Sequence, residues 1–163
     1  MIEAVIFDLD GTLIQLPIDY ERLFQEFKKI IKINNFHLLV ETVSKLDART
    51  RKDVFKVWDE AELAALTKMT INDEGIKIYK MFQQKPKALI TLQGKALVKA
   101  ALERLELSFN IIFTREDSLN RVEQLKNAAQ KLETQIQNVL FVGNTENDFL
   151  AAKKVNCQFL RVK

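Results

Sequence analysis

The sequence is poor in the residues that build disulfide-linked and metal-binding small domains. Its 163 residues include one cysteine and one histidine. The single cysteine, Cys157, excludes an internal disulfide and is typical of a reducing compartment, and we expect its thiol to lie in the core. With one histidine there is no Cys/His metal cluster. That residue, His37, lies in an apolar stretch, so we expect a core or surface residue rather than a catalytic base.

Long apolar runs and clusters of like charge are also absent. No stretch approaches the length of a membrane-spanning helix, and Met1 leads into a predicted strand without a basic leader. The 25 basic residues nearly balance the 22 acidic ones, and the lysines are scattered, so nothing indicates a nucleic-acid or membrane partner. A net charge of +3 mildly favours anionic small molecules. We therefore expect a cytoplasmic protein that is a monomer or a weak homodimer.

Glycine is scarce as well, and its positions exclude several nucleotide-binding and hydrolase motifs. Gly94-Lys95-Ala96 lacks the upstream glycine and the following serine or threonine of a P-loop, and neither a dinucleotide fingerprint nor a Gly-x-Ser-x-Gly elbow occurs. Three of the four glycines, Gly11, Gly94 and Gly143, instead follow apolar runs directly. Ligands of open parallel sheets bind beyond the carboxyl ends of the strands, where the strand order reverses. The glycines therefore indicate a single site at a sheet edge.

Apolar runs alternate with helical stripes through most of the chain. The predicted strands are residues 4–7, 87–91, 110–114, 139–143 and 158–162. Between them, apolar residues recur at helical spacing, as at Leu97, Ala101 and Leu105. This alternation favours an α/β fold, a doubly wound parallel five-stranded sheet with right-handed crossovers.

The segment between the only two prolines, Pro17 and Pro86, contains no strand-like run. Its apolar residues instead form four helical stripes, the first opened by Asp19 and the fourth by Asn72 as N-caps. Because a loop of about seventy residues is implausible in a compact domain, this segment predicts a small helical subdomain. We therefore divide the chain into a core of residues 1–16 and 87–163 and a helical cap of residues 17–86.

The first predicted strand ends in two carboxylates. Residues 4–7 form an uninterrupted apolar run, as in a strand covered on both faces, and Asp8, Asp10 and Gly11 follow. Gly11 permits a backbone turn that brings both carboxylates toward one point above the sheet edge. Carboxylates so placed are costly unless a cation lies between them, so the turn predicts a cation site rather than a simple turn cap.

Residues 8–13, Asp-Leu-Asp-Gly-Thr-Leu, resemble the first motif of the haloacid dehalogenase superfamily, whose members are mostly Mg²⁺-dependent phosphatases. The resemblance implies that Asp8 is the nucleophile, which becomes an aspartyl phosphate, and that Asp10 is the general acid and base. It also implies the strand order five-four-one-two-three and a Mg²⁺ ion held by Asp8, Asp10, Asn144 and Asp148.

The second predicted core strand ends in a residue similar to the second family motif. Thr91 stands where the family has a serine or threonine whose hydroxyl binds the transferring phosphoryl group. Leu92 and Gln93 then lead to a helix N-terminus, where backbone amides bind anions. The alternative for Thr91 is an ordinary β-branched strand residue.

Two further motifs depart from the family pattern. Residues 143–148 resemble the fourth motif, but Asn144 replaces an acid, so its amide oxygen can ligate Mg²⁺ without adding negative charge. Asp148 matches the motif, although an acid in a first helical turn is also favoured by the helix dipole. The lysine of the third motif is missing. Arg121, with Lys126 behind it, is our substitute, and a solvated helix residue is the alternative for Arg121.

These residues predict a Mg²⁺-dependent phosphatase that hydrolyses a small phosphate monoester from a phosphorylated metabolite. Asn144 and the missing lysine keep a second interpretation open, in which the chain is an inactive relative that binds a phosphate ligand or a protein. A phosphotransferase of the same superfamily is the nearest enzymatic alternative. A receiver-like signalling domain fits less well, because a long helical insertion follows the first strand.

Overall fold

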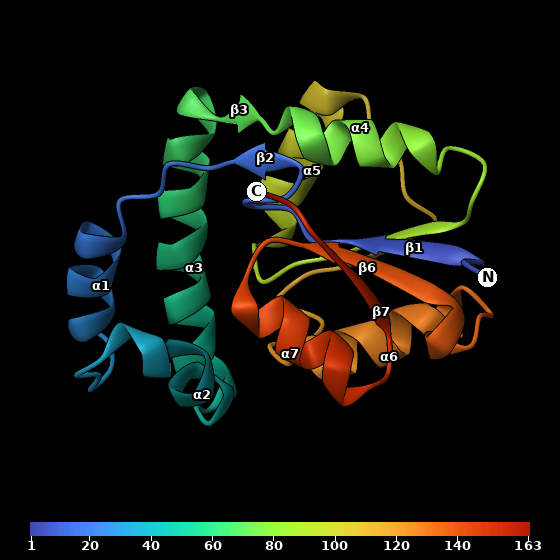
Figure 1. Cartoon of the computed structure of the whole chain (residues 1–163). Coiled ribbons are helices and arrows are strands. Elements are labelled where there is room, and N and C mark those ends of the chain that lie inside the picture. Colours follow the sequence, from blue (N-terminus) through green and yellow to red (C-terminus); the bar gives the residue numbers. More distant parts are fainter.

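The computed structural model describes all 163 residues and has a parallel five-stranded sheet at its centre (Figure 1). The strands are β1 (Ala4–Phe7), β4 (Lys87–Ile90), β5 (Ile111–Phe113), β6 (Val139–Gly143) and β7 (Gln158–Arg161). They lie in the order β5-β4-β1-β6-β7, and every adjacent pair is parallel. Numbered one to five along the chain and read from the β7 edge, this is the order five-four-one-two-three. The predicted α/β class and strand order are therefore confirmed.

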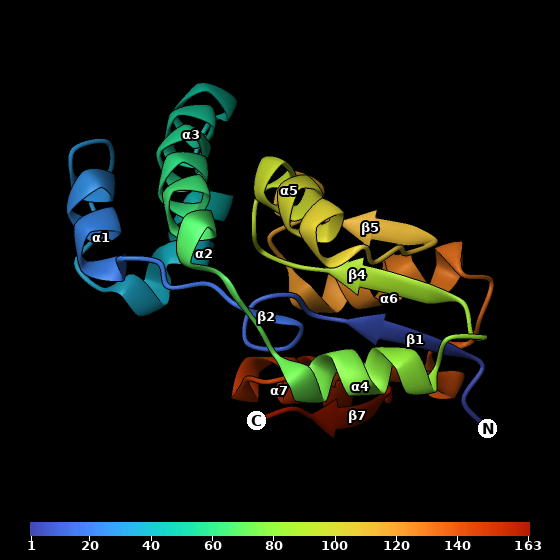
Figure 2. The same cartoon turned by 90° about the horizontal axis from the view of Figure 1, so that it is seen from above.

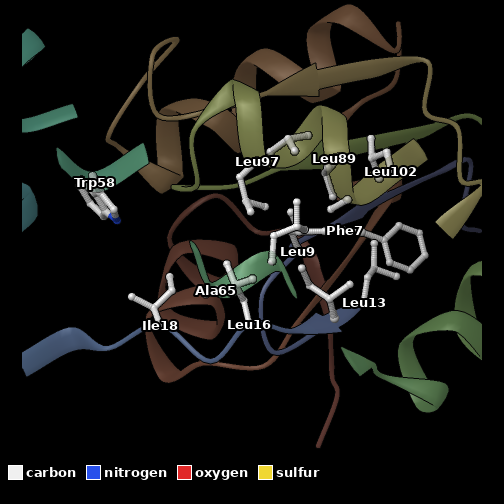
Figure 3. Close-up of a cluster of buried hydrophobic side chains, with 14 of the residues drawn as sticks. Phe7, Leu9, Leu13, Leu16, Ile18, Trp58, Ala65, Leu89, Leu97 and Leu102 are labelled. Carbon is white, nitrogen blue, oxygen red and sulfur yellow. The ribbon is translucent and has the colours of Figure 1, made fainter. Parts of the chain in front are cut away.

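Helices cover both faces of the sheet. Figure 1 shows α4 (Asp73–Met81) and α5 (Lys95–Leu105) above the sheet, and α6 (Arg121–Lys131) and α7 (Glu146–Lys154) below it. Successive residues of β1 point to opposite faces. Phe7 therefore packs with Leu89 and Leu97 in one core (Figure 3), whereas Ile6 joins the other core, between the sheet and helices α6 and α7. Burial on both faces explains why β1 is apolar without alternation.

Three helices lie beyond the carboxyl ends of the strands, α1 (Tyr20–Lys28), α2 (Leu39–Ser44) and α3 (Ala48–Ala65), and we call them the cap helices (Figures 1 and 2). The carboxylate of Asp19 caps α1 by accepting a hydrogen bond from the Arg22 amide at 3.0 Å, as predicted. The second stripe, predicted as one helix over residues 36–46, gives a shorter helix, because residues 36–38 form a 3₁₀ turn before α2. No helix in the structure combines the length and apolar composition of a transmembrane span.

Helix α4 packs on the sheet, away from the cap helices (Figure 1). The ring of Tyr79 lies 5.8 Å from that of Phe7, and its hydroxyl donates to the carbonyl of Ser108 at 2.7 Å. We therefore propose that the cap ends before α4, at about residue 69, and not at residue 86 as the prolines indicated.

A small antiparallel ribbon joins the two crossings between the cap helices and the core. It pairs β2 (Ile14–Gln15) with β3 (Thr70–Ile71). Neither strand was predicted from the sequence, because two residues are too few to show a period of two.

The cap helices and the core are joined by a buried ion network. Arg115, in the loop after β5, is the largest fully buried side chain of the chain. Its guanidinium pairs with Asp59 and Glu62 of α3, with 2.8 Å between Arg115 Nη1 and Glu62 Oε1. The same group lies 4.4 Å from the centroid of the Trp58 ring. Burial raises the pKa of Glu62 to about 7, because desolvation outweighs the attraction of Arg115.

Glu62 makes stability depend on pH. Because its pKa is raised in the folded state, its contribution to stability is fully present below the unfolded pKa of 4.5 and is lost as the pH rises through about 7. In wild type, the free energy of unfolding should therefore fall between pH 5 and pH 8. Because each pKa unit is worth about 1.4 kcal/mol, we expect this fall to be smaller in Glu62→Gln, by on the order of 2 kcal/mol. Denaturant titrations at the two pH values measure this. Equal falls in both proteins would contradict it.

Candidate active site

Asp8 leaves β1 at the centre of the sheet edge. Its amide donates to the carbonyl of Val142 on β6 at 2.9 Å, which continues the ladder by one residue and fixes the position of the side chain. The carboxylate is almost fully buried. Burial raises the pKa of Asp8 to about 7, against the lowering effect of Arg121, and the charges of Asp148 and Asp10 raise it further. Asp8 thus lies close enough to Asp10 and Asp148 for their charges to affect its ionisation.

The turn after Asp8 requires glycine. Gly11 has a φ of +79°, in the left-handed region, and a Cβ there would overlap Asn144 Nδ2. This close approach brings the turn against the end of β6. Thr12 completes the contact, because its hydroxyl donates to Asn144 Oδ1 at 3.3 Å. The turn after β1 and the turn after β6 therefore form one surface, as the strand order predicted.

Asp10 is tied to the segment that leads into the cap helices. Its Oδ1 accepts a hydrogen bond from the Leu16 amide at 2.9 Å. Burial nevertheless raises the pKa of Asp10, because desolvation outweighs its backbone hydrogen bonds. A carboxyl group with a raised pKa near a second carboxylate has the character of a proton donor.

Arg121 lies between two buried carboxylates. It is the first residue of α6, and its Nη2 donates to Asp8 Oδ1 at 3.2 Å, while its Nε lies 3.2 Å from Asp148 Oδ1. Its Nη1 donates to Gln124 Oε1 at 3.2 Å, one turn further along the helix. The structure thus brings Arg121 to Asp8, as expected of a substitute for the missing lysine. Lys126 is exposed and forms no ion pair.

Asp148 has two roles at the start of α7. Its Oδ2 accepts hydrogen bonds from the amides of Asn144 and Thr145 at 3.3 and 3.1 Å, and with the Thr145 hydroxyl it forms a capping box. Its Oδ1 is buried and has no hydrogen-bond partner, although it faces Arg121. The helix-cap and the site interpretations of Asp148 are therefore compatible, one for each oxygen.

Thr91 is buried at the end of β4, beside the same edge. Its hydroxyl donates to Gln93 Oε1 at 2.6 Å and accepts from the Gln93 amide at 3.1 Å, so Gln93 orients it. The amide of Leu92 has no hydrogen-bond partner within the chain. The free Leu92 amide is a suitable donor for an oxyanion, and the Thr91 hydroxyl becomes one when its proton turns from Gln93 Oε1 to the ligand.

The helix N-terminus that follows is already occupied by carboxylates. Glu62 Oε1 accepts from the Gly94 amide at 2.9 Å, and both oxygens of Glu116 lie 3.2 Å from the Lys95 amide. Of the amides at residues 92–94, only that of Leu92 is therefore free, because the Thr91 hydroxyl accepts from Gln93 and Glu62 accepts from Gly94. The Glu62 contact is tertiary, since Glu62 lies on α3 and no local pattern at residues 92–94 indicates it.

A cleft of about 570 Å³ opens beside Arg121, between the cap helices and the loop that precedes α6. Its lining includes His37, Ser44, Arg51, Phe55 and Arg121. Arg121 is the residue that this cleft shares with the acid group, because its guanidinium also contacts Asp8, which does not itself line the cleft. His37 is exposed here, as a surface residue.

The side-chain oxygens at this sheet edge are of the kind that binds magnesium. No group of three or more His, Cys, Asp or Glu side chains is arranged to hold a metal. Asp8, the Oδ1 of Asp148 and the amide oxygen of Asn144 remain, and all are the hard oxygen donors that Mg²⁺ prefers. The buried Oδ1 of Asp148 accepts no hydrogen bond and faces only the Arg121 guanidinium at 3.2 Å, which supports the fit. Two carboxylates and an amide favour a weakly held ion that keeps much of its water.

Asp8 thus lies at the switch point of a doubly wound sheet, where open α/β folds bind their ligands. The chain belongs to the haloacid dehalogenase-like hydrolase family, whose model matches residues 5–162. No curated protein matches the sequence.

Solved structures share the fold at low identity. A predicted phosphatase from Clostridium acetobutylicum is 18% identical with a TM-score of 0.73, and the match covers 100% of this chain and 85% of that one. A hydrolase from Pseudomonas syringae is 18% identical with a TM-score of 0.70, covering 97% and 82%. A family enzyme from Bacteroides thetaiotaomicron, solved with magnesium and inorganic phosphate, is 15% identical with a TM-score of 0.62, covering 100% and 95%.

Proposed function

We propose that the protein hydrolyses a small phosphate monoester, with Mg²⁺ as cofactor, through an aspartyl phosphate on Asp8. The observation that carries the proposal is the contact between the buried Asp8 carboxylate and the Arg121 guanidinium at the sheet edge. The family is one of hydrolases, and one structural neighbour contains magnesium and phosphate. We place the protein in the cytoplasm, as its composition predicted.

Asp8 attacks phosphorus, and the ester oxygen leaves with the proton of Asp10. Asp10 then takes a proton from water, which attacks the phosphorus of the aspartyl phosphate and restores Asp8. The Thr91 hydroxyl and the Leu92 amide bind phosphoryl oxygens, and Arg121 stabilises their charge. Asp8, Asp10 through its carbonyl, Asn144 and Asp148 would hold Mg²⁺, which supplies positive charge that offsets repulsion between carboxylate and phosphate.

A screen over sugar phosphates, phosphoglycolate and nucleotides, with and without Mg²⁺, tests the proposal. We expect turnover of at least one small monoester that chelation abolishes. Beryllofluoride, a phosphoryl mimic, should be found on Asp8 in a crystal structure. Density on a different residue, or turnover that survives chelation, would reject the corresponding part of the mechanism.

A second candidate is a module that binds a phosphate ligand or a protein without turnover. Two observations favour it, since Asn144 removes a charge from the metal site and carboxylates occupy the amides of Gly94 and Lys95. Phosphate binding with no hydrolysis of any monoester in the screen would support this candidate.

Asn144→Asp tests whether residue 144 belongs to a functional Mg²⁺ site. The substitution adds one negative charge to the proposed ligands of Mg²⁺. Near a protein surface, opposite charges about 4 Å apart attract each other by a few kcal/mol. Part of this is lost to repulsion among ligands, so we expect about tenfold tighter Mg²⁺ binding by isothermal titration. Asn147→Asp makes the same change at an exposed position nearby and should leave the affinity unaltered. Unchanged affinity in Asn144→Asp would place position 144 outside a metal site.

A further inference from the structure

The ion network of Arg115 reaches the loop that carries the proposed phosphate donors. Arg115 Nη1 donates to the carbonyl of Leu92 at 3.2 Å. Glu62 Oε1 accepts from the amide of Gly94 at 2.9 Å and pairs with the same guanidinium at 2.8 Å. The loop from Leu92 to Gly94 is therefore held at a carbonyl and at an amide, by one core residue and one residue of α3.

These two contacts restrain the peptide planes on either side of Gln93. The Arg115 contact holds the plane that carries the Gln93 amide, and this amide donates to the Thr91 hydroxyl at 3.1 Å, while Gln93 Oε1 accepts from the same hydroxyl at 2.6 Å. The Leu92 amide lies in the preceding plane, whose Thr91 carbonyl accepts from Gln124 Nε2 at 2.9 Å. A change in the Arg115 and Glu62 contacts therefore acts on the Thr91 hydroxyl through Gln93.

The composition of the network does not match a purely stabilising role. The side chains of Arg115 and Glu62 are fully buried, yet Arg115 Nε and Glu62 Oε2 have no hydrogen-bond partner. Buried ions that are only partly satisfied cost desolvation energy that their mutual attraction does not fully return. The pair instead fixes the orientation of the groups that it contacts. The planar guanidinium lies against the Trp58 and Phe55 rings, which hold it in one orientation.

We propose that Arg115 and Glu62 are positioning residues, which tie α3 to the loop of residues 92–94 and so set the geometry in which that loop meets a phosphoryl group. This inference depends on the proposed function, since it assigns phosphate binding to Thr91 and Leu92. Without these contacts the loop loses its restraints at the Leu92 carbonyl and at the Gly94 amide.

The test is the affinity of the full chain for inorganic phosphate, measured by isothermal titration in the presence of Mg²⁺. We expect Glu62→Ala and Arg115→Lys to weaken phosphate binding at least about tenfold. Glu62→Gln should stay within about threefold of wild type, because its amide oxygen still accepts the Gly94 and Arg115 hydrogen bonds. Glu60→Gln, on the exposed side of the same helix, is the matched control and should not change the affinity.

Hydrogen exchange separates positioning from general stability. In Glu62→Ala, the peptide containing residues 91–95 should exchange faster while that of β4 keeps its protection. Equal phosphate affinity in wild type, Glu62→Ala and Arg115→Lys would overturn the inference and leave the proposed function intact. Absence of phosphate binding by wild type would remove both. If Glu62→Ala does not fold, Glu62→Asp keeps the charge but retracts the carboxylate, and wild-type affinity in that variant would overturn the inference.

Discussion

Asp8→Asn is expected to lower kcat by at least about 10³-fold, because an amide oxygen of nearly the same shape is a poor nucleophile. The fold should be retained. Ionised Asp8 is unfavourable in its buried position, as its pKa of about 7 indicates, so replacing it with a neutral group should leave stability at pH 8 unchanged or raised.

Single-turnover assays and thermal unfolding measure the two parts of this expectation. Asp53→Asn, an exposed acid on α3, is a matched control that should keep full activity. Undiminished turnover in Asp8→Asn would remove Asp8 from the mechanism. A large loss of stability would instead assign the carboxylate a structural role that its pKa does not indicate.

The parts of the fold that the sequence predicts are those with strong local patterns. The uninterrupted apolar run of β1 indicates burial on both faces, and packing of Phe7 and Ile6 in opposite cores confirms it. Asn72 is predicted as an N-cap, and its side chain accepts from the Glu74 amide at 3.2 Å. Such signals lie within a few residues, so they depend little on distant parts of the chain.

The network around Arg115 could not be predicted in the same way, because its partners are about fifty residues apart. One signal was present in the sequence. Val54, Trp58 and Ala65 form the buried stripe of α3, and Glu62 lies on that stripe rather than on the solvent face. An acid at a core position of a helix indicates a buried cationic partner, but the sequence does not say which one.

Arg121 is the second residue whose substitution should greatly reduce activity, because its positive charge lies between Asp8 and Asp148. In Arg121→Met both buried carboxylates lose their cation, and the pKa of Asp8 should rise further, because Arg121 is what lowers it. We expect kcat/KM to fall about 100-fold at pH 7, from lost charge stabilisation and from fewer ionised nucleophiles. The pH profile should shift to higher pH, since Asp8 attacks only when ionised.

Arg121→Lys distinguishes charge from geometry. Lysine keeps the positive charge but has no planar fork, so it can contact one carboxylate well and not both. We expect kcat/KM within about tenfold of wild type and a pH profile close to the wild-type one. Lys126→Met removes a charge from the exposed side of the same helix and serves as the control. Wild-type kcat/KM in Arg121→Met would return Arg121 to the solvated-helix interpretation. Equal losses in the methionine and lysine variants would mean that the bidentate arrangement, and not the charge, supports catalysis.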